Sequence, residues 1–251
     1  MNIKWDAEKY TDNFSFVHRH GTDVLKLIER KNGKVLDLGC GNGALTKVLH
    51  DKGYDVIGAD ASDDMLGVAR KNNPDLTFVK ADATDFVLPE KVDVVFSNAV
   101  FHWIDRELHP KMLGCVYNAL NYGGEFVFEF GGRGNAEKIH TKLAEVFARH
   151  GYEYHTEYYF AGVGDYAPLV EQAGFMVKYA ELFERPTELK GDDGLADWIR
   201  MFLEVPFRTV KEKKEADEII SEAVNELEAE LYANGKWYAD YMRLRMRAVK
   251  T

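Results

Sequence analysis

A glycine-rich segment, VLDLGCGNG at residues 35–43, has the composition of a loop that holds a nucleoside-containing cofactor. It joins an apolar run to a helical pattern, and glycines let the backbone turn sharply and let a ligand approach where a Cβ would clash. Asp60 follows Gly39 by 21 residues, at the end of the next apolar run. An acidic residue about 20 residues after such a loop is placed to accept hydrogen bonds from ribose hydroxyls. The spacing therefore predicts a cofactor across the carboxyl ends of the strands.

The carboxylate of Asp37, two residues before the first glycine, narrows the choice of cofactor. Gly39, Gly41 and Ala44 also fit the GxGxxA pattern of dinucleotide sites, so the glycines alone do not decide. A carboxylate beside the loop would repel a pyrophosphate and would suit a cationic amino group or a sulfonium centre. S-adenosylmethionine carries both and has no phosphate, so we expect it as the cofactor. The alternative for Asp37 is a strand-end residue that bonds to local backbone.

Alternating strand and helix patterns would position this loop. Short apolar runs predict buried strands, and segments with a 3.6-residue period predict helices between them. Strand, helix and strand repeated four times predict an α/β fold, a doubly wound parallel sheet with helices on both faces. The predicted strands are residues 34–38, 54–59, 76–81, 92–97 and 125–130, and the predicted helices between them are 44–52, 64–72 and 107–120.

The carboxyl-terminal segment, residues 241–249, alternates between apolar residues and arginines. Arg243, Arg245 and Arg247 fall on one face, which predicts an antiparallel strand with a solvated side. The other interpretation of the three arginines is an anion-binding patch. Outside the repeated units, we expect further helices at 16–30, 135–150, 165–173 and 211–233, and a further strand at 175–183.

The composition limits the class of protein. Of 251 residues, 46% are hydrophobic and 13% aromatic, which is enough for a large core and excludes a disordered chain. The net charge of −10 argues against a nucleic-acid partner. The longest uncharged stretch has 13 residues, whereas a membrane-spanning helix needs about 18 or more. The amino terminus lacks the apolar core of a secretory signal, and two isolated cysteines make no disulfide framework. We therefore expect a cytoplasmic protein without a membrane partner.

Several motifs together resemble those of class I S-adenosylmethionine-dependent methyltransferases. VLDLGCGNG is similar to their first motif, VIGADAS at 56–62 to the motif of the second strand, and ADA at 81–83 to the motif after the third strand. SNAVFHWID at 97–105 and DYMRLRMRAVK at 240–250 look like the trans-aconitate methyltransferase-like branch.

The resemblance implies an architecture for the whole chain. We expect a single methyltransferase domain over residues 1–251, with a Rossmann-like, mostly parallel seven-stranded sheet and an antiparallel carboxyl-terminal strand. Its parts would be an amino-terminal cap and helix (1–33), a cofactor-binding core (34–131), and acceptor-side helices with the last strands (132–251). The helices of this last part would cover the acceptor site.

The resemblance also implies a role for each residue that matches a motif. The glycine-loop backbone would pass beneath the methionine moiety, and acidic side chains would hold the ribose and the adenine amino group. Met65, Val100 and Tyr10 fit ordinary packing equally well. Besides Asp37, the implied cofactor-binding residues are Gly39, Cys40 and Gly41 at the methionine moiety, Asp60 at the ribose, Ala61, Met65, Ala81, Asp82 and Ala83 at the adenine, Asn98, Ala99 and Val100 near the reactive carbon, and Tyr10 as a closing aromatic.

The acceptor decides whether a catalytic residue is needed at all. A carboxylate is ionised at neutral pH and needs no general base, whereas an amine or hydroxyl usually does. His102 and Trp103 follow the fourth strand and Arg133 follows the fifth, so all three are acceptor-pocket candidates. His102 would be a base or a locally bonded residue, and Arg133 a carboxylate partner or a solvated arginine. His18 and His20 lack further ligands, so no metal is expected.

A small-molecule acceptor fits the sequence best. Residues 98–101 read NAVF, where nucleobase amino methyltransferases carry Asn/Asp-Pro-Pro-aromatic, so nucleic acid is not expected. A carboxylate or another small polar oxygen nucleophile is the favoured acceptor. One alternative function is a nicotinamide-dependent oxidoreductase, although no suitable YxxxK pair is present. Another is a non-catalytic cofactor- or partner-binding module that uses the acidic helix 211–233. The aromatic residues predicted to enclose the acceptor include Tyr158, Tyr159, Phe160, Trp198 and Phe202.

Overall fold

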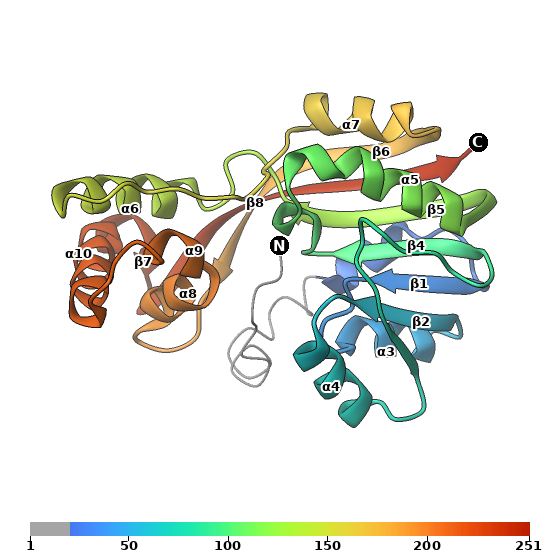
Figure 1. The fold of residues 1–251 in the computed structure, drawn as a ribbon, viewed down its shortest axis with the longest axis horizontal. Helices are drawn as coiled ribbons and strands as arrows, with labels where there is room; N and C mark the ends of the chain where they lie inside the picture. The colour runs from blue at the N-terminus through green and yellow to red at the C-terminus, as the bar shows by residue number, and fades with distance from the viewer. Residues whose placement is uncertain (1–20) are drawn as a thin grey trace. The chain divides into compact units, whose positions relative to one another are not determined.

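An open sheet with the strand order β3-β2-β1-β4-β5-β8-β6 forms the centre of the fold, and β7 pairs with β8 (Figure 1). The structure is a computed structural model that describes residues 21–251. Strands β1 to β5 pair in parallel, and β8 pairs antiparallel with β5. This confirms the predicted mostly parallel sheet with an antiparallel carboxyl-terminal strand. The strands are β1 (Lys34–Leu38), β2 (Asp55–Asp60), β3 (Thr77–Lys80), β4 (Val92–Asn98), β5 (Leu120–Gly131), β6 (Phe175–Glu188), β7 (Tyr232–Ala233) and β8 (Lys236–Lys250).

Helices cover both faces of the parallel strands. On one face, Leu36 of β1 packs in a core with residues of α5 and α7, and on the other face Val35 packs with residues of α3. Neighbouring residues of one strand are thus buried on opposite sides, as a doubly wound sheet requires. The helical segments are η1 (Leu25–Leu27), α3 (Ala44–Asp51), α4 (Asp63–Asn72), η2 (Phe101–Trp103), η3 (Arg106–Leu108), α5 (His109–Ala119), α6 (Glu137–Arg149), α7 (Val163–Gln172), α8 (Gly194–Phe202), α9 (Glu204–Phe207) and α10 (Lys213–Leu231).

Local sequence explains where α4 begins and ends beside the candidate site. Ser62 precedes the helix, and its hydroxyl accepts a hydrogen bond from Met65 N at 3.3 Å. The first turn carries Asp63, and the last turn carries Arg70, so side-chain charges oppose the helix dipole at both ends. This cap places the chain directly after Asp60 in a fixed conformation.

The chain divides into two compact units. The first contains the residues up to Arg133, then Tyr159–Leu182 and Arg243–Thr251, and the second contains Gly134–Tyr158 and Phe183–Met242. β6 and β8 therefore each contribute to both units. The predicted single domain over residues 1–251 stays a prediction.

The second unit is mainly helical, and ion pairs connect α6 with α10. Lys142 pairs with Glu226 at 3.0 Å, and Arg149 pairs with Glu222 at 2.7 Å. These side chains are partly exposed, so each pair stabilises the unit by about 0–1 kcal/mol. Packing of the apolar stripe of α10, which buries Ile219 among others, supplies the larger contribution.

Several predicted boundaries are wrong. β6 extends to Glu188 rather than to residue 183, and β8 begins at Lys236 rather than at residue 241. Within the described residues, the amino-terminal helical segment ends at Leu27 rather than at residue 30. Glu29 N and Arg30 N instead donate to the Glu125 carboxylate at 2.9 and 3.1 Å. The fifth strand begins at Leu120, five residues early, because an irregularity in the β4–β5 pairing accommodates the NYGG sequence at 121–124.

The prediction of a solvated arginine face on the last strand is also wrong. β8 lies inside the sheet beside β5, and its arginines are largely buried against β5 carboxylates. Arg243 and Arg245 both contact Glu129, at 3.3 and 2.7 Å, and Arg247 pairs with Glu29 at 2.6 Å. The alternating pattern of apolar residues and arginines predicted the strand correctly, but its charged face contacts carboxylates rather than water.

Candidate active site

The glycine loop is tied to the end of β2 and is open on one side. Gly39 N and Cys40 N both donate to Ala59 O, at 2.7 and 2.9 Å. At Gly39, with φ of +78°, a Cβ would overlap the Val100 side chain. At Gly41, with φ of +55°, the nearest atom to a Cβ would be Met65 Cε at 3.8 Å. Both glycines are therefore required by backbone conformation, and among residues 21–251, chain neighbours aside, no atom other than Met65 Cε comes within 4 Å of a Cβ at Gly41.

Asp60 fixes this loop with both carboxylate oxygens. Gly41 N donates to Oδ2 and Ser62 N donates to Oδ1, each at 2.8 Å. Burial raises the pKa of Asp60, and the backbone donors partly oppose that rise. Ala61 N also lowers the pKa of this carboxyl, and a carboxylate has about four acceptor positions, so acceptor capacity for a ligand remains. Ala61 beyond it is exposed.

Asp37 lies beneath the loop rather than on its surface. Its side chain is buried, and Thr46 Oγ1 of α3 donates to its Oδ2 at 2.6 Å. Burial raises the pKa of Asp37 to about 7; the Thr46 bond lowers it, and the charge of Asp60 raises it. Sequence reasoning missed Thr46, although a hydroxyl in the first turn of the helix after a glycine loop is a visible signal. Cys40 is also buried, which raises the pKa of its thiol.

The residues after β3 form a turn anchored to the end of β2. Ala81 N donates to Asp60 O at 3.0 Å. Asp82 Oδ1 accepts from both the backbone N and the hydroxyl of Thr84, each at 2.8 Å. Burial would raise the pKa of Asp82, but these bonds outweigh it and the pKa is lowered. Asp82 is therefore ionised. Ala83 lies between Asp82 and its hydrogen-bond partner Thr84 in the chain.

The end of β4 carries a strained residue between two candidate contacts. Ala99 has φ of +62°, unusual for a residue with a Cβ, and its N donates to Glu129 O at 2.7 Å. This turn places Val100 against Gly39. Asn98 is buried, and its Oδ1 has no hydrogen-bond partner among residues 21–251. An unpaired buried acceptor at the edge of the sheet is suited to an N–H donor from a ligand.

His102 is held as a neutral imidazole. Its ring is buried, and Gly131 N donates to Nδ1 at 3.3 Å. Burial, together with the charges of Arg243 and His109, lowers its pKa well below the ordinary range. Because Nδ1 accepts a hydrogen bond, the proton of the neutral ring is on Nε2. Trp103 lies beside it, with ring centroids 5.2 Å apart.

The remaining candidates are distributed differently from the sequence prediction. Arg133 is exposed after β5 and forms an ion pair with Asp165 of α7. Of the predicted acceptor-side aromatics, Tyr159 and Phe160 belong to the first unit, and Tyr158, Trp198 and Phe202 belong to the second. That they enclose an acceptor stays a prediction. Tyr10, His18 and His20 lie outside the described residues.

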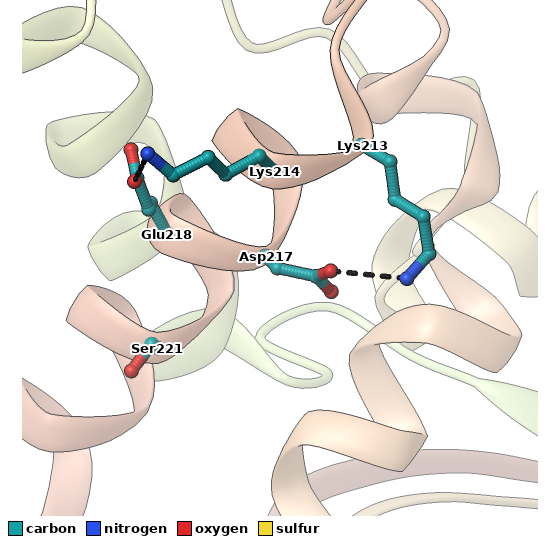
Figure 2. Close-up of a pocket in the computed structure, with 5 residues that line it drawn as sticks. All are labelled: Lys213, Lys214, Asp217, Glu218 and Ser221. Carbon is teal, nitrogen blue, oxygen red and sulfur yellow. Dashed lines mark hydrogen bonds and ion pairs between the residues drawn. The ribbon is translucent and has the colours of Figure 1, made fainter.

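The second unit also contains a charged hollow. A hollow beside the start of α10 is lined by two lysine–carboxylate pairs, Lys213–Asp217 at 3.3 Å and Lys214–Glu218 at 3.5 Å (Figure 2). Its charges are paired with each other along one helix, and it holds no residue of the glycine-loop site. Residues 21–251 contain no group of three metal-ligating side chains and no helix long and apolar enough to cross a membrane.

Comparison with known families and proteins agrees with this geometry. A family model described as a methyltransferase domain matches residues 35–124, which include the glycine loop, Asp60, Asp82 and the end of β4. A protein of Schizosaccharomyces pombe, described as an uncharacterised methyltransferase, is 33% identical over 260 residues, which are 98% of this chain and 98% of that protein.

Relatives with named acceptors align over shorter stretches. Trans-aconitate 2-methyltransferase of Rhodopseudomonas palustris is 34% identical over 57% of this chain and 56% of that protein. Malonyl-[acyl-carrier protein] O-methyltransferase 1 of Ilyobacter polytropus is 31% identical over 58% of this chain and 56% of that protein. The chain thus aligns with little more than half of each. A solved structure from Bacillus halodurans shares the fold, with a TM-score of 0.65, 17% identity, and coverage of 92% of this chain and 99% of that one.

Proposed function

This chain belongs to the class I S-adenosylmethionine-dependent methyltransferases, in their trans-aconitate methyltransferase-like branch, and from that premise we propose that it methylates a carboxylate oxygen of a small acceptor. The hydrogen bond from Gly131 N to His102 Nδ1 is the observation that carries this choice. This hydrogen bond occupies Nδ1 of His102, the ring nitrogen that would have to accept a proton if His102 were a general base. A carboxylate is the acceptor that needs no such base.

The residues around the glycine loop fit the cofactor. Asp60 retains acceptor capacity beyond its backbone donors, which suits ribose hydroxyls. Asn98 Oδ1 is a buried acceptor without a partner in residues 21–251, which suits the ammonium of the methionine moiety. The open space beside Gly41 and Met65 suits the nucleoside. Asp82 would bind the adenine amino group, and Asp37 beneath the loop would complement the cationic end of the cofactor.

Transfer to a carboxylate needs no proton movement. When bound, S-adenosylmethionine supplies a methyl group on a sulfonium leaving group, so a carboxylate oxygen forms the new C–O bond while the C–S electron pair stays on sulfur. The protein then contributes position and exclusion of water rather than acid–base chemistry. His109, the other histidine near this edge, is also engaged, because its Nδ1 lies 2.9 Å from Tyr166 Oη and its Nε2 lies 3.2 Å from Ile104 O.

The two relatives with named acceptors support the same chemistry. Trans-aconitate and the malonyl group both carry free carboxylates, and the second relative is named as an O-methyltransferase. Their alignments with this chain include little more than half of each protein, so the acceptor of this chain is proposed as a chemical class and not as a particular compound.

A panel assay tests the proposal. Purified protein is given S-adenosylmethionine and either carboxylates (trans-aconitate, malonate monoesters), amines or phenols, and methylated products are measured. With S-adenosylmethionine at saturating concentration, so that titration of Asp37 near pH 7 does not limit cofactor binding, we expect methylation of carboxylates at a rate that stays flat from about pH 6 to 9, because a carboxylate with a pKa near 4 is ionised throughout. Methylation of amines or phenols alone, with a rate that climbs with pH, would refute the proposal.

A substitution of His102 separates a structural role from a base. His102→Asn places an amide oxygen near the position of Nδ1, so the bond from Gly131 N is kept while the titratable ring is removed. We expect carboxylate methylation within about threefold of wild type. Loss of a general base costs about 100-fold or more, and a fall of that size would assign base catalysis to His102.

A further inference from the structure

A segment that begins at Tyr159 crosses the carboxyl ends of β4 and β5 within the first unit. Tyr159 N donates to His102 O, after β4, at 3.1 Å, and Arg133 N, after β5, donates to Ala161 O at 2.9 Å. The segment is therefore fixed to both loops. Ligands of open α/β sheets bind at the carboxyl ends of the strands, so this segment belongs to the ligand-binding edge.

One arginine lies over the Tyr159 ring, and a second, Arg133, lies against Gly162 of the same segment, where a Cβ would be 3.3 Å from Arg133 Cζ. Arg106 Cζ is 5.5 Å from the ring centroid, and the ring is packed edge-on against His109 at 4.8 Å. Burial raises the pKa of the Tyr159 hydroxyl, the charges of Arg106 and Arg133 lower it, and the charge of Asp165 raises it. Arg106 thus lies over the ring, and Arg133 is fixed to the same segment by its backbone bond to Ala161. Arg133 was an acceptor-pocket candidate from the sequence, whereas Arg106 was not.

The two arginines differ in their ion pairs. Arg133 pairs with Asp165, and Gly162 N donates to the same carboxylate oxygen at 3.0 Å, which holds Asp165 in place. Arg106 forms no ion pair with any carboxylate in residues 21–251. The guanidinium of Arg106 is therefore not engaged in an ion pair within the described residues, although Asp105 lies near enough to act on His109. Because a guanidinium has five N–H donors, Arg133 retains donors after it pairs.

We propose that Arg106, Arg133 and the Tyr159 hydroxyl bind a second anionic group of the acceptor, distinct from the carboxylate that is methylated. The proposal rests on the proposed carboxylate acceptor. The reacting carboxylate loses its charge as it is methylated, so arginines bound to it would stabilise the substrate more than the transition state and slow the reaction. The same arginines on a remote carboxylate bind substrate and transition state equally, and they fix the position of the reacting oxygen.

This assignment narrows the acceptor to small molecules with at least two anionic groups. A monocarboxylate has nothing for the cluster to bind and would be a poor substrate. A charged hydrogen bond is worth about 1.5–3 kcal/mol, so each arginine is expected to change the acceptor KM by about 10- to 100-fold.

The test uses the whole chain with two probes, trans-aconitate as a tricarboxylate and crotonate as a monocarboxylate. The variants are Arg106→Gln, Arg133→Gln, Arg133→Lys and Tyr159→Phe. Arg133→Lys keeps the charge that pairs with Asp165, so it controls for folding. Arg70→Gln is the matched control, because Arg70 is an exposed arginine of α4 beside β3, several strands away. Acceptor kinetics, calorimetric binding of trans-aconitate and calorimetric binding of S-adenosylhomocysteine are measured.

We expect wild type to prefer trans-aconitate over crotonate by at least 100-fold in kcat/KM. Arg106→Gln and Arg133→Gln should each raise the trans-aconitate KM at least tenfold with kcat within threefold, unchanged crotonate kinetics and unchanged S-adenosylhomocysteine affinity. Arg133→Lys should lie between wild type and Arg133→Gln, Tyr159→Phe should raise KM severalfold, and Arg70→Gln should match wild type.

Failure of this inference is distinguishable from failure of the proposed function. Equal activity of wild type on the two probes, or unchanged KM in the Arg106 and Arg133 variants, overturns the anion subsite and leaves carboxylate methylation standing. If wild type binds trans-aconitate in an arginine-dependent way but methylates no carboxylate, the subsite stands and the proposed function falls. If wild type neither binds nor methylates trans-aconitate, the subsite is overturned.

Discussion

Replacement of Asp60 tests the central assignment of the site. In the absence of ligand, its two oxygens already hold Gly41 N and Ser62 N at 2.8 Å each. Asp60→Ala removes both acceptors from backbone N–H groups. Asp60→Asn keeps the size of the side chain, but its amide NH₂ must face one of these two N–H donors. The structure therefore predicts that the asparagine variant does not behave as a mild version of the alanine variant.

The magnitudes follow from counting hydrogen bonds. A hydrogen bond to a charged group contributes about 1.5–3 kcal/mol, and loss of two ribose contacts is partly offset by water in the vacated site. We expect Asp60→Ala to weaken S-adenosylmethionine binding by about 10- to 1000-fold, at about 1.4 kcal/mol for each factor of ten. We also expect both variants to lose about 1–3 kcal/mol of unfolding free energy without ligand, because each leaves at least one partly buried N–H without an acceptor.

Calorimetric titration with S-adenosylmethionine and urea unfolding of the ligand-free protein separate the two effects. Asp55→Ala is a suitable control, since Asp55 is an exposed carboxylate at the opposite end of the same strand. The control should match wild type in both measurements. An Asp60→Ala protein with wild-type affinity would refute the ribose assignment. An Asp60→Asn protein as stable as wild type would refute the role of the two backbone donors.

Substitutions at three further residues address the surroundings of this loop. Asp37, whose pKa of about 7 lies above the ordinary 3.8, takes up a proton on folding, so its contribution to stability is complete below about pH 4 and is lost as pH rises to 7. The difference in urea unfolding free energy between wild type and Asp37→Asn should therefore fall from pH 4 to pH 7 and level off above; a constant difference would contradict the burial of this carboxyl. Ala99→Gly should leave stability nearly unchanged, whereas Ala99→Val should cost about 1–3 kcal/mol at φ of +62°, again measured by urea unfolding; equal stability of the two would show that the left-handed turn is absent. Asp82→Ala should weaken S-adenosylhomocysteine binding by about 1–2 kcal/mol in calorimetric titration, and an unchanged affinity would remove it from the adenine site.

The parallel half of the fold was predictable because its signals are local. Buried parallel strands appear as short apolar runs, and four of the five predicted strands match β1 to β4 within one residue at each end. The glycine loop and Asp60 were predictable for the same reason, since the chain brings them together through consecutive strand ends.

The partners of charged side chains were not predictable, because they come from distant parts of the chain. Alternation cannot tell that the arginine face of β8 meets Glu129, which lies on a strand more than a hundred residues earlier. The hydrogen bond that occupies His102 Nδ1 comes from the backbone of Gly131, and a backbone group carries no sequence signal. The role of Arg106 could not be predicted from the sequence, because only the structure shows that it lies over the Tyr159 ring.

The position of β8 has a consequence for biosynthesis. It lies between β5 and β6 in the sheet but follows both in the chain, so a ribosome completes every other strand of the sheet before this one. Until β8 emerges, β5 and β6 lack a shared neighbour, and Glu129 lies in an apolar sheet without its arginines. Unpaired strand edges favour association with other chains, so the nascent protein is most exposed to aggregation shortly before synthesis of this segment. We therefore expect that a messenger RNA whose codons slow translation just before the β8 segment gives a lower yield of soluble protein.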